Sequence, residues 1–273
     1  MEELSHEIIL DNELTQVYFD SIDAENQLIP LHWHNHLEIL IVQEGILYGY
    51  VNEQSYKLTP GDVLIVNPKD IHYTHMRGRV YYDLLQISEV HLKRIRKDWQ
   101  LIHFQEYLPK NEAISAIFST LKHLLEEHKP GNQLLFLAQI YQLFYLLYTN
   151  SATILTIEDR NQTDRDLKRI ELCMQYVRKN YQKSITLSDI SDLLSLSPEY
   201  FCRLFKKYTG QSFLTYVNQI RMYHFHEELL HTNESITYLL EKNGITSYKV
   251  FMKQFKSTYT KTPYILRKEF NAK

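Results

Sequence analysis

A Ser–Pro pair at residues 197 and 198 opens a stretch whose residue types suit contact with nucleic-acid bases. The Ser197 side chain can accept a hydrogen bond from an N–H group at a helix start, and proline suits the first helical position. Helical spacing then places four polar residues on one face: Glu199, Cys202, Arg203 and Lys206. This face can enter the major groove of DNA, where the Arg203 guanidinium can pair with both O6 and N7 of guanine.

The neighbouring charged residues suit other contacts. Lys206 and Lys207, with Lys256 further along the chain, can neutralise phosphates, which position a protein on DNA without specifying sequence. Glu199 can accept a hydrogen bond from cytosine N4, or its charge can favour the helix N-terminus, and both interpretations stay open. Packing is favoured over base contact for three aromatic residues: Tyr200, Tyr208 and Tyr248.

The elements that must position this face form a helix-turn-helix. Residues 187–190 open a short helix, and Ser195–Leu196 makes a tight turn before Ser197. The inward side of the second helix is apolar: Phe201, Leu204 and Phe205.

The pattern repeats at a distance of fifty residues. The shift lays Ser197 on Ser247, Phe201 on Phe251, Arg203 on Lys253, Phe205 on Phe255, Lys206 on Lys256 and Ser212 on Thr262. In the second copy, Ser235 starts a helix, Asn243–Gly244 supplies a left-handed turn, and Ser247 starts the next helix. The outward residues of that helix are Lys249, Met252, Lys253 and Lys256. One long helix over residues 213–231 links the copies, so that two recognition helices can contact adjacent major-groove segments about 34 Å apart.

The distribution of charge also divides the chain into two parts. Residues 165–273 hold 18 Lys and Arg against 10 Asp and Glu, whereas residues 1–164 hold 12 against 23. The basic half suits a polyanion, although a solvated basic face explains the charge equally well. With 44% hydrophobic residues, seven glycines and seven prolines, the chain is expected to be globular rather than disordered.

Other features point to the cytoplasm. The acidic N-terminus lacks the pattern of a secretory signal, and the longest apolar stretch, residues 134–148, is too short to span a bilayer. The two cysteines, Cys173 and Cys202, imply no disulfide framework and suit a reducing compartment. We therefore expect a soluble cytoplasmic protein with no membrane partner.

Residues 28–87 show the alternation of an antiparallel sandwich or small barrel. Short apolar runs are separated by Gly, Pro, Asn and Asp, and the expected strands cover residues 37–42, 46–51, 63–66 and 81–87. Two helices are predicted next, over residues 112–128 and 132–148, and the second is apolar on most of its circumference. Packing on the barrel can cover it, but a second subunit covers it more completely, and a homodimer is favoured.

The last hundred or so residues resemble the AraC/XylS family of transcription regulators. The resemblance rests on FKKYTGQSF, the Asn243–Gly244 turn, FKSTYTKTP and the fixed distance between the two units. It implies promoter binding by both motifs, with DNA contacts from Glu199, Tyr200, Cys202, Arg203, Lys206, Lys207, Tyr248, Lys249, Met252, Lys253 and Lys256. The chain departs from the family's pattern at Ser195, Leu240, Ile245 and Thr260, so the second motif is expected to pack differently and to contact fewer bases.

The N-terminal half resembles a cupin barrel. In metal-binding cupins a pair of histidines, a glutamate and a distant histidine converge, and the matching set for iron, zinc or manganese is His32, His34, Glu38 and His72. The barrels of AraC-type regulators generally bind organic effectors, often sugars, so an effector pocket or plain structural histidines are favoured, with no metal and no cofactor. The expected pocket adds aromatic faces to these four residues: Trp33, Tyr48, Tyr50 and Tyr73.

These observations predict a two-domain protein, with an all-β cupin-like jelly-roll barrel flanked by two helices and an all-α domain of two helix-turn-helix motifs joined by a long helix. The expected divisions are a barrel (1–106), a helical dimerisation segment (107–150), a turn-rich linker (151–164) and a DNA-binding domain (165–273). We expect a regulator, not an enzyme, that activates transcription in response to a carbohydrate and contacts RNA polymerase if it activates; repression fits the residues as well. The alternatives are a metal-dependent cupin enzyme or metal sensor, and an effector-independent DNA-binding dimer.

Overall fold

The computed structural model describes residues 16–127 and 129–271. The acidic N-terminal segment, for which no secretory signal is expected, lies outside these residues, as does the last residue of the helix expected at 112–128. Within the described part of the chain, no helix is both long and apolar enough to cross a membrane.

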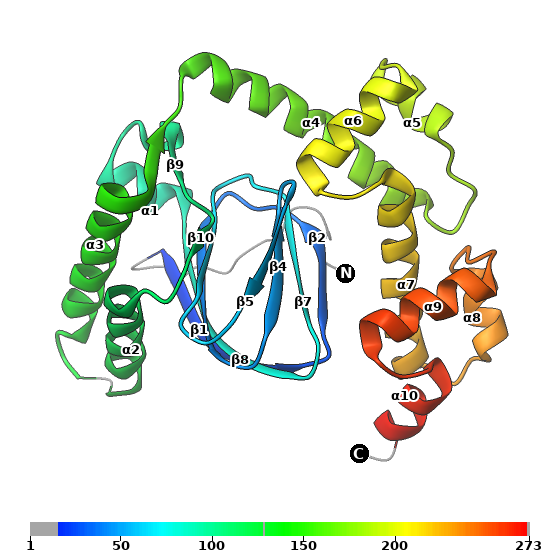
Figure 1. Ribbon diagram of the computed structural model, residues 1–273, viewed down its shortest axis with the longest axis horizontal. Coiled ribbons are helices and arrows are strands. Elements are labelled where there is room, and N and C mark those ends of the chain that lie inside the picture. The colour runs from blue at the N-terminus through cyan, green and yellow to red at the C-terminus, as the bar shows by residue number, and fades with distance from the viewer. Residues whose placement is uncertain (1–15, 128, 272–273) are drawn as a thin grey trace.

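The first half of the chain forms two antiparallel sheets that face each other (Figure 1). The larger sheet has the order β1 (Val17–Glu25), β8 (Arg79–Ile87), β3 (Leu37–Glu44), β6 (Val63–Val66) and β10 (Tyr107–Leu108). The smaller sheet has the order β2 (Leu28–His32), β7 (His72–Met76), β4 (Leu47–Val51) and β5 (Gln54–Leu58). The four strands expected from alternation are β3, β4, β6 and β8, and the N-terminal all-β class is confirmed.

The inner faces of the two sheets bury an apolar core. Along β4, buried and half-exposed residues alternate, so Tyr48 and Tyr50 lie on the outer face. Gly49 between them has no room for a side chain, because a Cβ there would lie 2.6 Å from Cδ2 of Leu64. The outer face of the smaller sheet is therefore the side that carries the tyrosines.

Two helices, α2 (Glu112–Glu127) and α3 (Asn132–Ser151), cover the outer face of the larger sheet (Figure 1). Their buried residues Phe118, Leu121, Phe136 and Ile140 belong to one apolar cluster with sheet residues such as Ile39. This confirms the two flanking helices. The short α1 (Glu89–Ile95) and the 3₁₀ turn η1 (Trp99–Leu101) connect the barrel to β9 (Ile102–Phe104).

Residues 151–164 do not form the expected turn-rich segment. β11 (Ala152–Ile154) pairs antiparallel with β9, and α4 (Ile157–Asn180) begins three residues later. The Thr156 side chain accepts a hydrogen bond from the backbone N–H of Asp159 and starts this helix. The segment is polar because the first turns of α4 are solvated, and composition alone does not separate such a helix from a turn.

The second half is all-helical and contains both expected motifs, as Figure 1 shows. The first consists of α5 (Leu187–Leu194) and α6 (Pro198–Thr209), and the second of α8 (Ile236–Lys242) and α9 (Tyr248–Tyr259). They are joined by α7 (Phe213–His231), and α10 (Pro263–Phe270) closes the chain. Each motif has its own core: Phe201, Phe205 and Tyr216 are buried in the first, and Phe225 and Phe255 in the second.

The barrel packs against the first helical motif. Leu31 and Ile71, each about 1% exposed, belong to the same apolar cluster as α4, α6 and α7, and the half-buried Trp33 and Tyr73 pack against it. Lys69 of the barrel also forms an ion pair of 2.9 Å with Asp164 of α4. The two halves therefore share one continuous buried contact along β2 and β7.

Candidate nucleic-acid interface and candidate ligand sites

One face of α6 is exposed and polar, while the opposite face is buried. Every residue expected to contact DNA from this helix is exposed: Glu199, Tyr200, Cys202, Arg203, Lys206 and Lys207. Phe201, Leu204 and Phe205 on the opposite face are at most 5% exposed. Tyr208 is also buried, and its hydroxyl donates a hydrogen bond of 3.3 Å to Asp166, so packing was the correct expectation for this tyrosine.

Caps and a strained turn fix the direction of α6. The Ser197 side chain accepts a hydrogen bond from the backbone N–H of Tyr200, and Pro198 occupies the first turn. The preceding α5 has a reciprocal capping box between Thr186 and Asp189. Ser195 then reverses the chain in the left-handed region, with a φ of 53°. These caps are local signals that the sequence carries, and they set where α6 begins.

The outward face of α9 repeats that of α6 with one difference. Tyr248, Lys249, Lys253 and Lys256 are exposed, whereas Met252 is half-buried and packs against the core of the second motif. Met252 is therefore less available to a base than the sequence repeat suggests.

The four positions that depart from the family's pattern are accommodated in the fold. Leu240 is 9% exposed and Ile245 is half-buried, and both pack in the core of the second motif. Ser195 and Thr260 stand where glycine is usual, and both adopt left-handed backbone, with φ values of 53° and 60°. Residues with a Cβ are strained in this region.

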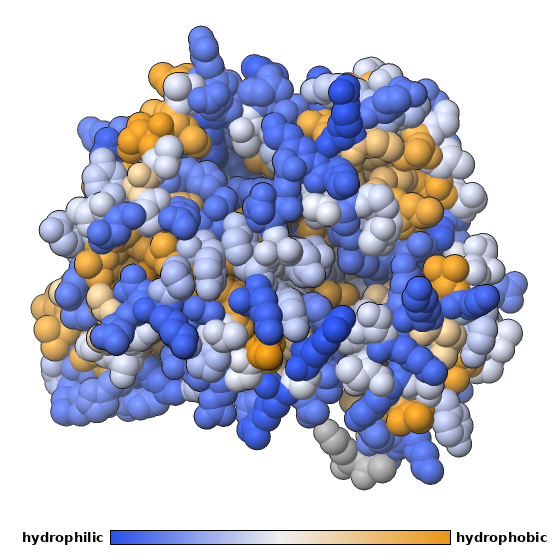
Figure 2. Space-filling model, viewed as in Figure 1, coloured by the Kyte–Doolittle hydropathy of each residue, from blue (hydrophilic) through white to orange (hydrophobic). Residues whose placement is uncertain are grey.

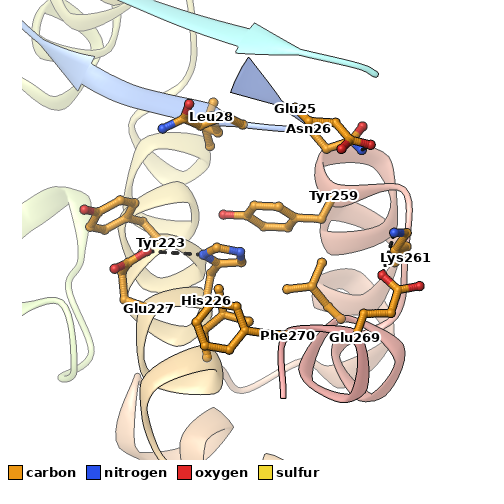
Figure 3. A pocket seen from close by; sticks show the side chains of 13 residues that line it. Glu25, Asn26, Leu28, Tyr223, His226, Glu227, Tyr259, Lys261, Glu269 and Phe270 are labelled. Carbon is orange, nitrogen blue, oxygen red and sulfur yellow. Dashed lines mark hydrogen bonds and ion pairs between the residues drawn. The ribbon is translucent and has the colours of Figure 1, made fainter. Parts of the chain in front are cut away.

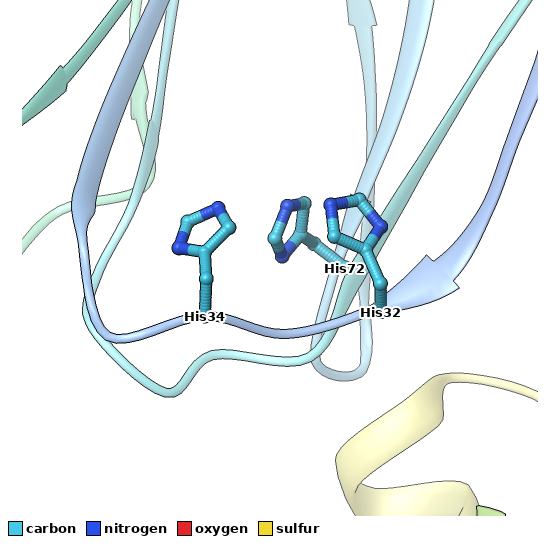
Figure 4. A group of neighbouring side chains, drawn as sticks. All are labelled: His32, His34 and His72. Atoms are coloured by element: carbon cyan, nitrogen blue, oxygen red, sulfur yellow. The ribbon is translucent and has the colours of Figure 1, made fainter. Parts of the chain in front are cut away.

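A polar cluster lies inside the barrel at one end. His32 ends β2, His34 follows in the loop to β3, Glu38 lies on β3 and His72 begins β7. His34, Glu38 and His72 are 0%, 5% and 1% exposed. Figure 4 shows the three imidazoles side by side, and one ligating atom of each lies within 4.8 Å of the others.

Hydrogen bonds fix the orientation of these rings. Nε2 of His34 lies 3.0 Å from Oε2 of Glu38, and the Gln86 side chain donates a hydrogen bond of 2.7 Å to the same oxygen. Burial favours the neutral carboxyl, but the contacts with His34 and His72 outweigh it and hold the pKa of Glu38 below its usual range. Burial, and then the charge of His32, lower the pKa of His72. These shifts favour the ionised form of the Glu38 carboxylate and the neutral form of the His72 imidazole.

The four aromatic residues expected beside this cluster lie elsewhere. Tyr50 stacks on Tyr73, with ring centroids 4.1 Å apart, and Tyr48 stacks on His75, all on the outer face of the smaller sheet. Trp33 packs against the core of the first helical motif. The eight expected effector residues therefore fall into two groups, one inside the barrel and one on its outer side, and do not line a single pocket.

A cleft of about 540 Å³ separates the β1–β2 turn from α7, α9 and α10 (Figure 3). Aromatic rings from the helices line it, including Tyr223 and a stacked pair in which His226 lies 4.3 Å from Tyr259. Its polar lining comes from both halves of the chain: Glu25, Asn26, Gln27, Glu227, Lys261 and Glu269. This cleft was not predicted from the sequence, because no local signal indicates that residues 25–28 face α7.

Two family models match this chain. A model of the AraC-like ligand binding domain matches residues 16–144, and a model of a helix-turn-helix domain matches residues 190–269. The first covers the barrel with α2 and most of α3, and the second runs from within α5 to near the end of α10.

Curated relatives extend over most of the chain. The lactose operon transcription activator of Staphylococcus xylosus is 26% identical over 232 residues, which are 80% of this chain and 78% of that protein. The HTH-type transcriptional activator RhaS of Pectobacterium carotovorum subsp. carotovorum is 22% identical over 256 residues, 87% of each chain. Among solved structures, ToxT from Vibrio cholerae is 15% identical, with a TM-score of 0.48 over 92% of this chain and 98% of that one.

Proposed function

The chain belongs to the AraC family of DNA-binding transcription regulators with a ligand-binding domain, and we propose that it activates transcription in response to a carbohydrate. The relatives reported above are named as transcription regulators, and the chain is a regulator rather than an enzyme. The single observation that carries the DNA-binding mechanism is α6, whose polar face is exposed over its whole length while its apolar face is buried.

In this proposal α6 makes the base contacts. Arg203 pairs with guanine in the major groove, while Lys206 and Lys207 neutralise phosphates. α9 contributes mainly phosphate contacts through Lys253 and Lys256, because Met252, the other outward candidate beside Lys253, packs inward. Two helices held by α7 then cover two adjacent major-groove segments.

Salt dependence separates these roles. The logarithm of the affinity for duplex DNA falls linearly with the logarithm of the salt concentration. Measured between about 50 and 200 mM salt, this slope should become less steep by roughly one in Lys206→Ala, because one phosphate contact disappears. Arg203→Ala should instead relax the preference at one base pair, by about 1–3 kcal/mol. Lys57→Ala on β5 is a matched control, since Lys57 is exposed but lies on the barrel. Equal effects of all three substitutions would contradict the assignment of α6.

The carbohydrate proposal rests on a relative's name and on the cleft of Figure 3. A relative is named as an activator of a lactose operon, which supports both activation and a sugar effector. The cleft of about 540 Å³ lies within the usual range for ligand pockets, roughly 300–1,000 Å³. Its aromatic faces can stack on a sugar ring, and Asn26 and Glu227 can bond hydroxyls. A sugar held there contacts both the barrel and the second motif, and so biases their arrangement.

Apolar side chains on the outward side of α3 point to assembly with a second subunit. Leu134, Leu135 and Tyr145 on the outward side of α3 are 74%, 56% and 67% exposed, and Figure 2 shows hydrophobic residues reaching the surface over the α1–α3 side. A second copy of the chain is the proposed cover of these side chains.

We place the division between barrel, dimerisation helices and DNA-binding half at residues 106, 150 and 165. We also place the protein in the cytoplasm, with RNA polymerase as the partner of its active form.

Thermal unfolding of the full chain against mono- and disaccharides tests the effector. A sugar at 100 times its Kd should stabilise the protein by about 2.7 kcal/mol. Tyr223→Ala and Glu227→Gln should each remove the shift, and Glu241→Gln, an exposed glutamate on α8, should retain it. A shift that persists in both cleft variants would place the sugar elsewhere, and the absence of any shift would favour an effector-independent dimer.

A further inference from the structure

We propose that the cleft of Figure 3 selects an amino sugar, a carbohydrate that carries a protonated amine, over neutral and acidic sugars. This inference rests on the proposed sugar response and adds to it the charge of the ligand.

Carboxylates outnumber cations along the cleft. Among the described residues, its charged lining consists of three glutamates, Glu25, Glu227 and Glu269, and one lysine, Lys261. Nζ of Lys261 lies 2.6 Å from Oε2 of Glu269, so these two charges offset each other. With histidine neutral, three carboxylates against one ammonium leave the lining with a formal charge of −2. A positively charged ligand therefore fits this cleft better than a negatively charged one.

Glu25, the last residue of β1, brings a negative charge from the barrel to the helical half. The pKa of Lys261 is raised mainly by its hydrogen bond to Glu269, and the charge of Glu25 adds to this effect across the cleft. Arg79 lies opposite Glu25 in the sheet but forms its ion pair with Asp23. Within the described part of the chain, no lysine or arginine forms an ion pair with Glu25, and a cationic ligand can take that place.

Glu227 supplies a second carboxylate, beside the aromatic rings. Burial raises the pKa values of Tyr223 and Tyr259, and the charge of Glu227 raises both further, so this carboxylate lies close to the two hydroxyls. Its neighbours on α7 are the imidazoles of His226 and His231, at 3.3 and 3.9 Å. Burial lowers the pKa of His226 and favours its neutral form. An ammonium group held here meets a carboxylate and aromatic faces together, and both attract a cation.

The remaining lining suits the sugar ring itself. Phe270 from α10 and Leu28 from β2 add apolar surface, and Figure 3 shows both side chains at the cleft. Gln27 in the β1–β2 turn carries an amide that both donates and accepts, as hydroxyl groups require. A neutral sugar can therefore also bind, and the amine decides the preference among sugars of the same shape.

The preference should be moderate, because the carboxylates are solvated. The side chains of Glu227 and Glu269 are 44% and 51% exposed, and Glu25 is also exposed. Exposed charges interact weakly and are screened by salt. We expect an amino sugar to bind about three- to tenfold more tightly than its neutral parent at low salt.

Titration of the full chain with a matched panel of sugars tests the charge of the ligand. The panel holds galactosamine and glucosamine, their N-acetyl derivatives, the parent hexoses and the two uronates, at about pH 7, below the usual pKa of an α-amino group of about 7.7–8.0. Within one series the amino sugar should bind most tightly, the neutral sugars less tightly and the uronate least. This order should weaken as the salt concentration rises.

Two substitutions of opposite charge make the test specific to the cleft. Glu25→Gln should reduce the preference for the amino sugar over its parent at least twofold and leave binding of the parent nearly unchanged. Lys261→Gln should increase the preference, because it removes the one lysine of the lining. Glu126→Gln, at an exposed position on α2, is the control and should change neither affinity.

Equal affinities for the amino sugar and its parent, or tighter binding of the uronate, would overturn this inference and leave the proposed sugar response intact. A preference for the amine that survives unchanged in both Glu25→Gln and Lys261→Gln would also overturn it, because the selecting charge would then lie elsewhere. If no sugar of the panel binds, the proposed function itself fails, and the inference fails with it.

Discussion

Gly210 at the end of α6 faces the carbonyl oxygen of Asn52 in the β4–β5 turn so closely that a Cβ at residue 210 would lie 2.8 Å from that oxygen. The turn that follows the proposed recognition helix is thus docked on the barrel backbone. Gly210 also has a φ of 67°, so glycine is required both by the conformation and by the contact. The position of α6 is tied to the barrel at this point.

Gly210→Ala should loosen this docking. The left-handed backbone costs about 1–2 kcal/mol for alanine, and the clash with Asn52 adds to it. Gly78→Ala is a matched control, because Gly78 has a φ of 83° and nothing within 4 Å of its Cβ position. Calorimetry should show a larger loss of stability at residue 210, with faster limited proteolysis between the halves. Equal losses at both glycines would show that the Asn52 contact contributes nothing.

Ser195→Gly and Thr260→Gly should each stabilise the protein. Both residues adopt left-handed backbone, which costs about 1–2 kcal/mol for a residue with a Cβ and which glycine avoids. Glycine is more flexible in the unfolded chain, and this offsets roughly 0.5–1 kcal/mol of the stabilisation. The net expectation is a gain of up to about 1.5 kcal/mol, measured by denaturant unfolding. A loss of stability would mean that the side chains make contacts worth more than the strain.

Stability should fall as the pH drops below about 6.5, in part through His226. Burial lowers the pKa of His226, with opposing contributions from Glu227 and a further lowering from His231. The unfolded chain then binds a proton that the folded chain excludes, so the free energy of unfolding decreases with falling pH. His226→Gln should flatten the dependence between pH 7.5 and 5 in urea unfolding. It should not abolish it, because burial also lowers the pKa values of His75 and His224.

His123→Gln is the control for that experiment, since this histidine is largely exposed and lies on α2, away from α7. A pH profile that changes equally in both variants would contradict the assignment to His226.

Leu134→Glu should convert a dimer into a monomer in sedimentation experiments. Leu134 is 74% exposed on α3, and a charge there opposes burial in a subunit interface. Leu214→Glu provides the comparison, because Leu214 is 62% exposed but lies on α7. Dimerisation that survives the α3 substitution and fails with the α7 substitution would move the interface to the helical half.

The parts of the fold with local signals were predictable. Ser197–Pro198, the Thr186 capping region and the fifty-residue repeat determine α5, α6 and α9, because caps and helical periodicity act over a few residues. The strand that carries Tyr48 and Tyr50 was also expected. The sequence did not indicate which face of this strand is buried, since alternation alone does not say which sheet face meets a neighbour.

The contacts between the barrel and the helical half could not be predicted from the sequence. Nothing near Gly210 indicates Asn52, and nothing near Tyr223 indicates the β1–β2 turn, because such contacts depend on how two separately folded units meet. The polar cluster of His32, His34, Glu38 and His72 was predictable in part. The convergence of His32, His34 and His72 was expected from a resemblance. That the buried Nε2 of His72 has no hydrogen-bond partner among the described residues became visible only in the structure.

Selection of binding sites from randomised duplex DNA tests the central claim, that α6 reads sequence. Wild-type protein should enrich a site with conserved base pairs in two segments about one helical turn, or ~34 Å, apart. Arg203→Ala should enrich a site that has lost its preference for guanine at one position and keeps the others. Identical sites for wild type and variant, or no enrichment by either, would contradict base contact by α6.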